Sequence, residues 1–315
     1  MSDQILISIC IPAYKRIEFL KRLLDSIQIQ EFRNFEVVVT DDSADEGIKR
    51  MCDHFQEHFP ISYYRNQQPL GTPENWNEAI RKAKGNWIKL MLDDDWFGDE
   101  KSLGYFAEAI TSNPACSFIF SAFRNIDLQS GKMEDILVDS FRYKMLLKDP
   151  ASLVSQNIIG PPSVILHKND RRVFYDNKLK WLVDIDFYIR SLMGRTPVYI
   201  NRVLVFVGIG EFQVTADCFG QRPVEIPENF YLLNRAGIHH LKNIMVYDAW
   251  WRLMRNLKIT QESEIVASGY TGRVPHAISS MIRTQRILPA VLLNNGTFSK
   301  SFMFLHYLIH YRGIR

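Results

Sequence analysis

The stretch over residues 86–96 constrains the fold and function of this chain more than any other part of it. It is an apolar run with strand character that ends in three consecutive carboxylates, Asp93, Asp94 and Asp95. Adjacent carboxylates repel one another, so a hard divalent cation is the simplest way to relieve their charge at the end of a buried strand. Mg²⁺ and Mn²⁺ take oxygen ligands, usually one or two carboxylates together with substrate phosphates and water. The residues alone leave a solvated acidic turn as the alternative to a metal site.

Two further strands end in polar residues in the same way. Near-continuous apolar runs over 5–11 and 35–40 are typical of strands covered on both faces in a parallel sheet, and the segment between them has apolar residues at helical spacing. Alternating strands and helices predict a doubly wound α/β sheet, in which ligands bind beyond the carboxyl ends of the strands. We expect three polar clusters at that edge: Pro12-Ala13-Tyr14, Asp41-Asp42-Ser43 and the three aspartates. No GxGxxG follows the first strand and no GxxxxGK[ST] occurs, which disfavours dinucleotide-binding Rossmann and P-loop proteins.

The composition excludes several classes of protein. With 46% hydrophobic and 23% charged residues the chain is an ordinary globular protein, and its net charge of +3 gives no global field for nucleic acid. The four cysteines have no CxxC spacing, which disfavours zinc and a disulfide framework and favours a reducing cytoplasm. The first residues lack a basic segment followed by an apolar core, and no apolar stretch reaches the ~18 residues of a spanning helix. We expect a soluble or peripheral protein without signal peptide or nucleic-acid partner.

Four segments of the first hundred residues resemble, in order and spacing, the nucleotide-binding half of a family-two glycosyltransferase with a GT-A fold. The matching segments are 9–16, 37–43, 71–85 with its Asn-x-Asn and Ala-Lys-Gly, and 92–95. The resemblance implies an α/β GT-A fold, with a Rossmann-like, mostly parallel sheet flanked by helices and a mainly helical C-terminal extension. We expect a GT-A domain over 1–225, divided into a nucleotide-binding half (1–112) and an acceptor half (113–225), and a helical region over 226–315.

In that family the Pro-Ala-Tyr segment and the second aspartate after the second strand hold the nucleobase, and the spaced aspartates of the DxD motif bind the metal. By this resemblance Tyr14 would stack on the base and Asp42 would accept its N–H, while Asp93 and Asp95 would hold Mn²⁺ or Mg²⁺. Asp94 is the middle position, and a register slip of one residue leaves the choice between Asp93 and Asp94 open. The expected nucleotide-binding residues are Pro12, Ala13, Tyr14, Arg16, Asp42, Asn77, Asp93 and Asp94.

A second acidic cluster precedes an apolar helical segment within residues 181–190. Its Asp184 and Asp186 would suit a helix N-terminus, so a helix cap is one interpretation. The cluster also resembles the family's Glu-Asp-x-Asp-x-x-x-Arg motif, in which the aspartate of the Glu-Asp pair is the general base. That aspartate aligns with Asp184, although Val183 stands where glutamate is common. Asp186 and Arg190 lie four residues apart and could pair on one helix face, and we expect them either to support the site or to have a structural role.

Two later segments carry basic residues. The stretch 208–222 is polar, and Arg222 is a candidate for neutralising a leaving phosphate. The final segment, 300–315, is aromatic, apolar and basic without an acid. This composition suits the interface of an anionic membrane, but it equally suits a packed terminal helix, and both interpretations stay open.

Together these features predict a metal-dependent, inverting glycosyltransferase of the hexosyltransferase type. By resemblance it would move a sugar from a nucleoside diphosphate, UDP in the first place, to a hydroxyl of a glycan or lipid-linked acceptor. The setting would be cell-surface polysaccharide synthesis in the cytoplasm, peripheral on the inner face of the cytoplasmic membrane. One alternative is a sugar-phosphate nucleotidyltransferase, which usually has a glycine-rich phosphate loop that residues 12–16 lack. The other is a non-catalytic sugar-nucleotide or glycan-binding module, which the intact Asp93, Asp95 and Asp184 disfavour.

Overall fold

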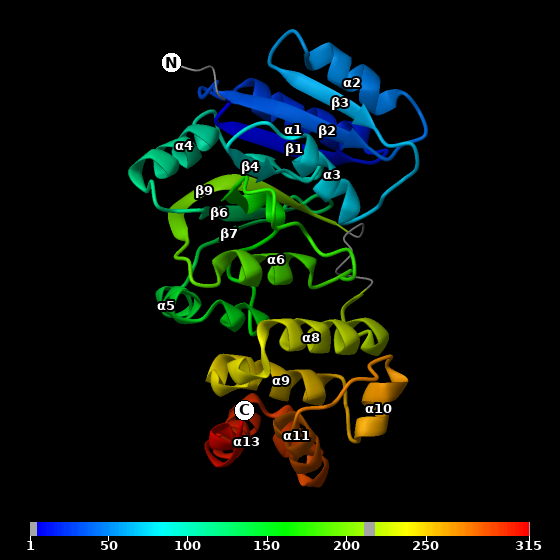
Figure 1. The fold of residues 1–315 in the computed structure, drawn as a ribbon, viewed down its shortest axis with the longest axis vertical. Helices are drawn as coiled ribbons and strands as arrows, with labels where there is room; N and C mark the ends of the chain where they lie inside the picture. The colour runs from blue at the N-terminus through cyan, green and yellow to red at the C-terminus, as the bar shows by residue number, and fades with distance from the viewer. Residues whose placement is uncertain (1–4, 211–217, 315) are drawn as a thin grey trace. The chain divides into compact units, whose positions relative to one another are not determined.

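The computed structural model describes residues 5–210 and 218–314. The chain forms two compact units, each made of several segments. Unit 1 comprises Met1–Tyr143, Ile158–Lys178 and Arg190–Phe212, and unit 2 comprises Lys144–Asn157, Leu179–Ile189 and Gln213–Arg315. This division differs from the single boundary expected after residue 225, because two short segments before that point belong with the C-terminal helices. Figure 1 shows the path of the chain by colour.

Strands and helices alternate through the first part of the chain, as the sequence predicts, and helices dominate the last part. The strands are β1 (Ile7–Ala13), β2 (Phe35–Asp41), β3 (Ile61–Arg65), β4 (Trp87–Leu90), β5 (Trp96–Phe97), β6 (Phe118–Asp127), β7 (Met133–Ile136), β8 (Ile165–Lys168) and β9 (Val198–Ile209). The α-helices are α1 (Ile17–Gln28), α2 (Gly47–Phe55), α3 (Glu74–Lys82), α4 (Ser102–Ser112), α5 (Ser140–Lys148), α6 (Val183–Leu192), α8 (Arg222–Ala236), α9 (Ile244–Asn256), α10 (Glu262–Ala267), α11 (His276–Ile287), α12 (Ala290–Asn294) and α13 (Gly296–His310). Short 3₁₀ helices are η1 (Pro150–Val154), η2 (Pro162–Val164), η3 (Ile238–Lys242) and η4 (Tyr311–Gly313).

The strands of unit 1 form one mixed sheet with the order β3-β2-β1-β4-β8-β6-β9-β5, and β7 pairs with β6. β3, β2, β1 and β4 are parallel to one another, as are β6 and β9. β8 runs antiparallel to both β4 and β6, and β5 and β7 are antiparallel to their partners. The predicted parallel α/β arrangement is thus confirmed for the first four strands, and the second half of the sheet is mixed.

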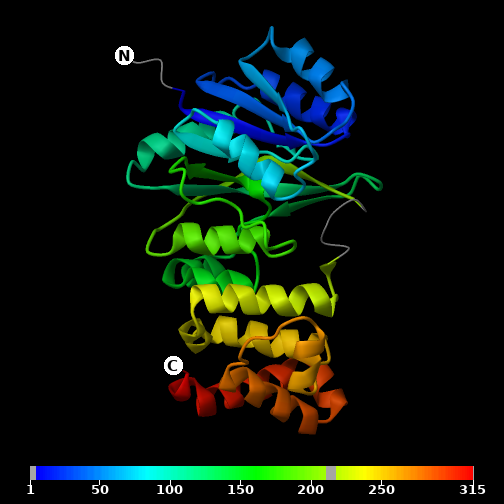
Figure 2. The ribbon, with the colours of Figure 1, turned by 45° about the vertical axis from the view of Figure 1, so that its right-hand side comes forward.

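The connections between the parallel strands place helices on both faces of the sheet. From β1 the chain runs through α1 to β2 and through α2 to β3, and then returns through α3 to β4 on the other side of β1. Because such crossovers are right-handed, α3 covers the face opposite to α1 and α2 (Figures 1 and 2). The strand order therefore reverses between β1 and β4, and ligands bind at this kind of switch point in open α/β sheets.

The core of unit 1 explains the apolar runs in the sequence. All seven residues of β1 and of β2 are buried, so neither strand shows the alternation of a half-exposed sheet. Helix α1 buries Leu20, Leu23, Leu24 and Ile27, which recur at intervals of three and four residues and so lie on one face. Burial of each such side chain stabilises the fold by roughly 1.5–3 kcal/mol relative to exposure.

Unit 2 is built of helices around an aromatic core. Trp250 and Trp251 of α9 are buried with Phe230 of α8 and Met281 of α11 in one cluster. The ring of Phe230 also stacks on that of Tyr270, with the centroids 4.1 Å apart. The mainly helical C-terminal region is therefore confirmed. Among the residues described, none of the helices combines the length and apolarity that a membrane crossing needs.

Candidate active site

The three aspartates of the acidic run lie in a tight turn after β4, beside the C-terminal end of β1. Asp93, Asp94 and Asp95 are only 3%, 8% and 2% exposed, so the chain does not form the solvated acidic turn. Arg16, which follows β1, donates from Nη2 and Nε to the two carboxylate oxygens of Asp93 over 2.6 and 3.2 Å. Its Nη1 lies 3.7 Å from the carboxylate of Asp94. A bidentate pair of this kind fixes geometry as well as charge.

The backbone of the acidic turn is also held from two sides. Arg22 of α1 lies 3.7 Å from the centroid of the Trp96 ring and donates to the carbonyl of Asp94 over 2.8 Å. On β9, Gly208 approaches the same carbonyl so closely that a Cβ atom would lie 2.5 Å from it. A residue with a side chain at position 208 would therefore displace the turn.

Asp95 has one carboxylate oxygen for which the described residues provide no hydrogen-bond partner. Its Oδ1 accepts from the N–H of Gly208 over 3.2 Å, whereas its Oδ2 is buried and unpaired. Burial and the neighbouring Asp94 raise the pKa of Asp95 well above its usual range. A buried carboxylate is costly unless it is paired or bound to a metal. Asp95 therefore fits a divalent cation, whereas both oxygens of Asp93 are engaged by Arg16.

The protein alone offers few ligands to such a cation. Within residues 5–210 and 218–314, no group of three or more His, Cys, Asp or Glu side chains could hold a metal ion. Mg²⁺ commonly takes one or two carboxylates and completes its shell with substrate phosphates and water. Burial raises the pKa of Asp93 to about 7 and raises that of Asp94 above its usual value, so added positive charge would favour the ionised turn. The arrangement suits a cation that is shared with a phosphate-bearing ligand.

Pro12, Ala13 and Tyr14, the expected nucleobase segment, lie at the end of β1. Pro12 and Ala13 are buried within the strand, whereas Tyr14 follows it and is 47% exposed. Lys15 then takes a left-handed conformation with a φ of 61°, which turns the chain sharply towards α1. An exposed aromatic ring at the carboxyl edge of the sheet suits stacking on a planar base. Its contact with a base stays a prediction.

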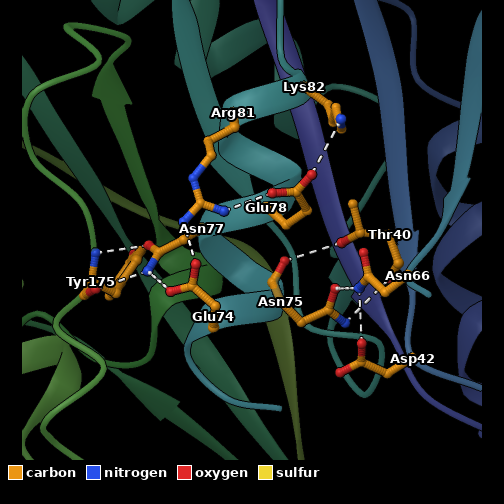
Figure 3. Close-up of polar contacts among 10 residues, drawn as sticks. All are labelled: Thr40, Asp42, Asn66, Glu74, Asn75, Asn77, Glu78, Arg81, Lys82 and Tyr175. Atoms are coloured by element: carbon orange, nitrogen blue, oxygen red, sulfur yellow. Dashed lines mark hydrogen bonds and ion pairs between the residues drawn. The ribbon is translucent and has the colours of Figure 1, made fainter. Parts of the chain in front are cut away.

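Asp42 is buried after β2 and holds the loop that precedes α3 (Figure 3). Its Oδ1 accepts from the N–H of Leu70 over 2.9 Å and from the side-chain amide of Asn66 over 2.8 Å. Its Oδ2 accepts from the N–H of Gly71 over 2.8 Å. Because a carboxylate has about four acceptor positions, one remains for a further donor. Asp42 thus orders residues 66–71, and its contact with a base N–H stays a prediction.

The two asparagines of the Asn-x-Asn motif brace unit 1 (Figure 3). Asn75 lies at the ends of two strands, where its Nδ2 donates to the carbonyls of Thr40 and Ala13 over 3.3 and 3.5 Å. Asn77 is buried and exchanges two hydrogen bonds of 2.9 Å with the backbone of Tyr175. Both amide atoms of Asn77 are hydrogen-bonded within the protein, which gives this residue a bracing role, and its contact with a nucleotide stays a prediction.

In unit 2, Asp184 lies in the first turn of α6. Its Oδ1 accepts from the N–H of Ile185 and its Oδ2 from the side-chain amide of Asn157, both over 2.8 Å. Burial raises the pKa of Asp184 to about 6, because the charged form loses contact with water. A carboxylate with such a pKa can take up a proton near neutral pH. The environment therefore suits the general base that the resemblance implies, and Asn157, which no sequence pattern marks, orients it.

The segment before α6 is held by Glu228 of α8, a residue that the sequence analysis missed. Its carboxylate oxygens accept from the N–H groups of Lys180, Trp181 and Leu182 over 2.7, 3.0 and 2.9 Å. A carboxylate at a helix N-terminus satisfies N–H groups that lack a helical partner and interacts favourably with the helix dipole. Because these partners are 46 to 48 residues away along the chain, no local pattern could have indicated the contact.

Asp186 and Arg190, expected to support the site, make separate contacts. Asp186 is completely buried, and its carboxylate lies 3.4 Å from Nη1 of Arg235. Arg190 donates to the carbonyl of Phe174 over 2.7 Å. Both residues therefore hold backbone and helices in place.

Arg222, the candidate for neutralising a leaving phosphate, makes several contacts within unit 2. Its Nε and Nη2 donate to the carbonyls of Leu257 and Lys258 over 2.8 and 2.9 Å. Its Nη1 forms an ion pair of 3.1 Å with Glu264. In this structure the guanidinium pairs with Glu264 and joins α8 to the loop after α9, and the leaving-phosphate role stays a prediction.

A cavity of about 380 Å³ in unit 2 adjoins Asp184. Its lining includes Asn157 and Trp181 next to the carboxylate, and Arg252 and Asn256 from α9. The volume lies within the range of about 300–1,000 Å³ that is usual for ligand pockets. An aromatic ring together with amide and guanidinium donors suits a hydroxylated ligand such as a sugar.

Comparison with known sequences identifies the family. The model of glycosyl transferase family 2 matches residues 8–173, which is more than half of the chain. An uncharacterized glycosyltransferase of Haemophilus influenzae is 28% identical over 214 residues, which cover 64% of this chain and 67% of that protein. The abequosyltransferase RfbV of Salmonella typhimurium is 37% identical over 94 residues, 29% of this chain and 28% of RfbV. The match to RfbV thus spans less than a third of either protein.

Solved structures share the fold at low sequence identity. S. aureus TarS 1–349 in complex with UDP has a TM-score of 0.60 at 14% identity, covering 98% of this chain and 90% of that one. The chain covers 54% of a longer TarS structure. The mannosyltransferase PcManGT of Pyrobaculum calidifontis, in complex with GDP-Man and Mn²⁺, has a TM-score of 0.56 at 14% identity, covering 98% and 86%. These likenesses confirm the predicted α/β GT-A fold.

The matched residues 8–173 contain β1 to β4, the acidic turn and the Asn-x-Asn helix, so the family match covers the same features that the structure gathers at the switch point. Since the match extends over more than half of the sequence, this chain belongs to glycosyl transferase family 2.

Proposed function

We propose that this protein is a metal-dependent, inverting glycosyltransferase of the hexosyltransferase type. It moves a sugar from a UDP-linked donor to a hydroxyl of a glycan or lipid-linked acceptor in the synthesis of a cell-surface polysaccharide. The observation that carries the proposal is the environment of Asp184, a partly buried carboxylate oriented by Asn157 at the edge of a cavity of about 380 Å³. Its pKa of about 6 leaves it ionised at neutral pH and still able to accept a proton.

The chemistry is a single displacement. The ionised carboxylate of Asp184 accepts the proton of the acceptor hydroxyl while the hydroxyl oxygen bonds to the anomeric carbon of the donor sugar. The bond between that carbon and the diphosphate oxygen breaks on the opposite face, and its electron pair leaves with the nucleoside diphosphate. Attack from the opposite face inverts the anomeric configuration, and one positioned base suffices without a covalent nucleophile.

At the donor site the residues of unit 1 would bind and orient the nucleotide. Tyr14 would stack on the base, and Arg16 would keep Asp93 in place through their bidentate pair. A divalent cation held by Asp95 would neutralise charge on the departing diphosphate. The Mn²⁺ ion in the PcManGT complex supports a divalent cation in the donor site of this protein. The UDP in the TarS complex supports uracil as the base of its donor.

The proposed setting is the cytoplasm at the inner face of the cytoplasmic membrane. Cys10, Cys52, Cys116 and Cys218 are all buried free thiols, which agrees with a reducing compartment. The similarity to a bacterial abequosyltransferase supports a bacterial saccharide acceptor.

Thermal unfolding with UDP, GDP, dTDP and their sugars, each with and without Mn²⁺, tests the donor site. A ligand that binds only the native state raises its stability by about 2.7 kcal/mol at a hundredfold excess over its Kd. We expect a Mn²⁺-dependent shift with UDP that Asp95→Asn abolishes. Absence of a shift with every nucleotide, from folded protein, would contradict the donor site and favour a module that binds glycans only.

The variant Asp184→Asn tests the catalytic part separately. The amide keeps the shape of the side chain but cannot accept the acceptor's proton. We expect Asp184→Asn to bind UDP in the presence of Mn²⁺ as tightly as the unmodified chain and to lose at least roughly 100-fold in kcat. Unchanged kcat would remove Asp184 from the mechanism while leaving the donor site intact.

A further inference from the structure

Helix α13 turns polar side chains towards the interior of unit 2. Ser299 and His306 of this helix are buried. The hydroxyl of Ser299 accepts from the indole N–H of Trp251 over 3.1 Å, and His306 lies 2.7 Å from the hydroxyl of Tyr247. These polar groups have their partners inside the fold, where Met303 of the same helix is also buried in the core.

The exposed side of α13 is apolar. Its exposed apolar residues are Phe298, Phe304, Leu305, Leu308 and Ile309, each between 46% and 75% exposed. We call these five residues the C-terminal apolar face. The segment before α13 adds Ile287 and Val291, which are 77% and 81% exposed. Single exposed apolar residues are ordinary, but a cluster of this kind marks an interaction surface.

The part of the chain that carries this face has only positive charges. From residue 265 to the end of the sequence there is no Asp or Glu, whereas Arg and Lys occupy six positions. Five of these residues are described and all five are exposed: Arg273, Arg283, Arg286, Lys300 and Arg312. A basic segment is attracted to anionic lipid headgroups. A second copy of the chain would bring the same charge against it, which disfavours self-association through this face.

A cavity of about 620 Å³ reaches the border of the C-terminal apolar face. Ile309 belongs both to the face and to the cavity lining, which also includes Arg273, His276 and His310. The guanidinium of Arg273 and the imidazole of His276 beside an apolar surface suit the phosphate of a lipid headgroup, whereas both ring nitrogens of His310 already contact Ser280 and the carbonyl of His306.

We propose that the C-terminal apolar face docks on the surface of an anionic phospholipid bilayer. The apolar side chains of α13 would lie at the boundary between headgroups and acyl chains, and the surrounding Arg and Lys residues near the lipid phosphates. Docking deepens the proposed setting at the inner face of the cytoplasmic membrane, on which it rests. Because vesicle binding needs neither donor nor acceptor, it can fail while glycosyl transfer holds, and the reverse. Where both hold, docking keeps the enzyme on the surface in which a lipid-linked acceptor is embedded.

Co-sedimentation of the full chain with vesicles tests the proposal. We compare phosphatidylcholine vesicles with vesicles that also contain phosphatidylglycerol, at low and high salt. Binding should require phosphatidylglycerol and weaken with salt, because exposed charges are screened. The double variant Leu305→Glu with Ile309→Glu should lower the vesicle partition coefficient by roughly tenfold or more, because it places charge in the apolar face. The matched control is Val266→Glu on α10, where the replaced side chain is 55% exposed.

Thermal unfolding and far-UV circular dichroism show that each variant is folded. Equal binding to both kinds of vesicle, or equal loss with Val266→Glu, would overturn the proposal. Light scattering tests the alternative, in which a second copy of the chain covers the face. If the unmodified chain forms a dimer and does not bind vesicles, and if Leu305→Glu with Ile309→Glu dissociates that dimer, the face is assigned to a second copy and membrane docking is overturned.

Discussion

Asp184 is the residue whose environment sets the pH at which transfer begins. Burial raises its pKa to about 6, and only the ionised carboxylate can accept a proton. We expect kcat/KM to rise with pH through about 6 and then to level off, as measured in a pH–rate profile. The hydrogen bond from Asn157 stabilises the charged form, so Asn157→Ala should raise the pKa and move the acid limb to higher pH by roughly half a unit or more.

The control for this prediction is Asn256→Ala, which changes the lining of the same cavity at another position. We expect it to raise the KM for the acceptor and to leave the acid limb in place. An acid limb that is identical in Asn157→Ala and in the unmodified enzyme would contradict the assignment of that limb to Asp184.

Lys89 of β4 should make the stability of the protein depend on pH, because burial shifts the pKa of this lysine downward. It is completely buried, and its Nζ donates to the carbonyls of Ser163 and Ile165. Burial lowers its pKa to about 7, whereas a lysine in the unfolded chain titrates near ~10.4. Between these values the unfolded chain binds more protons, so Lys89 makes the free energy of unfolding rise with pH from about 7 to about 10, by at most about 1.4 kcal/mol per pH unit.

Urea unfolding at pH 7, 8 and 9 measures this effect, and Lys89→Met should remove the rise because methionine does not titrate. Lys101→Met is the matched control, since Lys101 is exposed and its removal should leave the slope unchanged. Parallel slopes for Lys89→Met and the unmodified chain would show that Lys89 does not titrate in this range.

At the scale of elements, α3 joins two parts of unit 1 through two asparagines on one helix. The side-chain amide of Asn77 donates to the carbonyl of Tyr175 and accepts from its N–H. Because Asn77→Ala removes both hydrogen bonds, it should lower the free energy of unfolding by about 2 kcal/mol. We expect the Kd for UDP to stay unchanged in that variant. Asn75→Ala should instead weaken UDP binding, because Asn75 links the ends of β1 and β2 through Ala13 and Thr40.

Calorimetric titration with UDP and Mn²⁺ separates the two variants of α3, and unfolding in urea confirms that each is folded. If Asn77→Ala weakened UDP binding as much as Asn75→Ala does, the nucleotide contact expected from the sequence would be restored and the bracing role would be secondary.

At the scale of the whole molecule, the sequence predicts what is local and misses what long-range packing creates. The apolar runs of β1 and β2 and the acidic turn are each a continuous stretch of sequence, so the residue pattern of each stretch indicates whether that element is buried. The pairing of Arg16 with Asp93 joins residues 77 positions apart, and that of Asn77 with Tyr175 residues 98 apart. Such pairs depend on how elements pack, which periodicity does not record. For the same reason neither Asn157 nor Glu228 had a signal in the sequence.

The division into units differs from the boundary expected after residue 225, which stays a prediction, and truncation tests that boundary. A chain that ends at residue 225 would lack Glu228, which holds the segment before α6, and the core residues Trp250 and Trp251. Segments 144–157 and 179–189 belong to unit 2, and in the truncated chain they would lack the helical core of that unit. We expect this truncated chain to lose glycosyl transfer and to be cleaved by protease within those two segments, because their backbone loses its packed surroundings. Limited proteolysis followed by mass spectrometry, with the full chain as control, locates the cuts. Full transfer activity in the chain of residues 1–225 would show instead that the boundary expected from the sequence separates an independent catalytic domain.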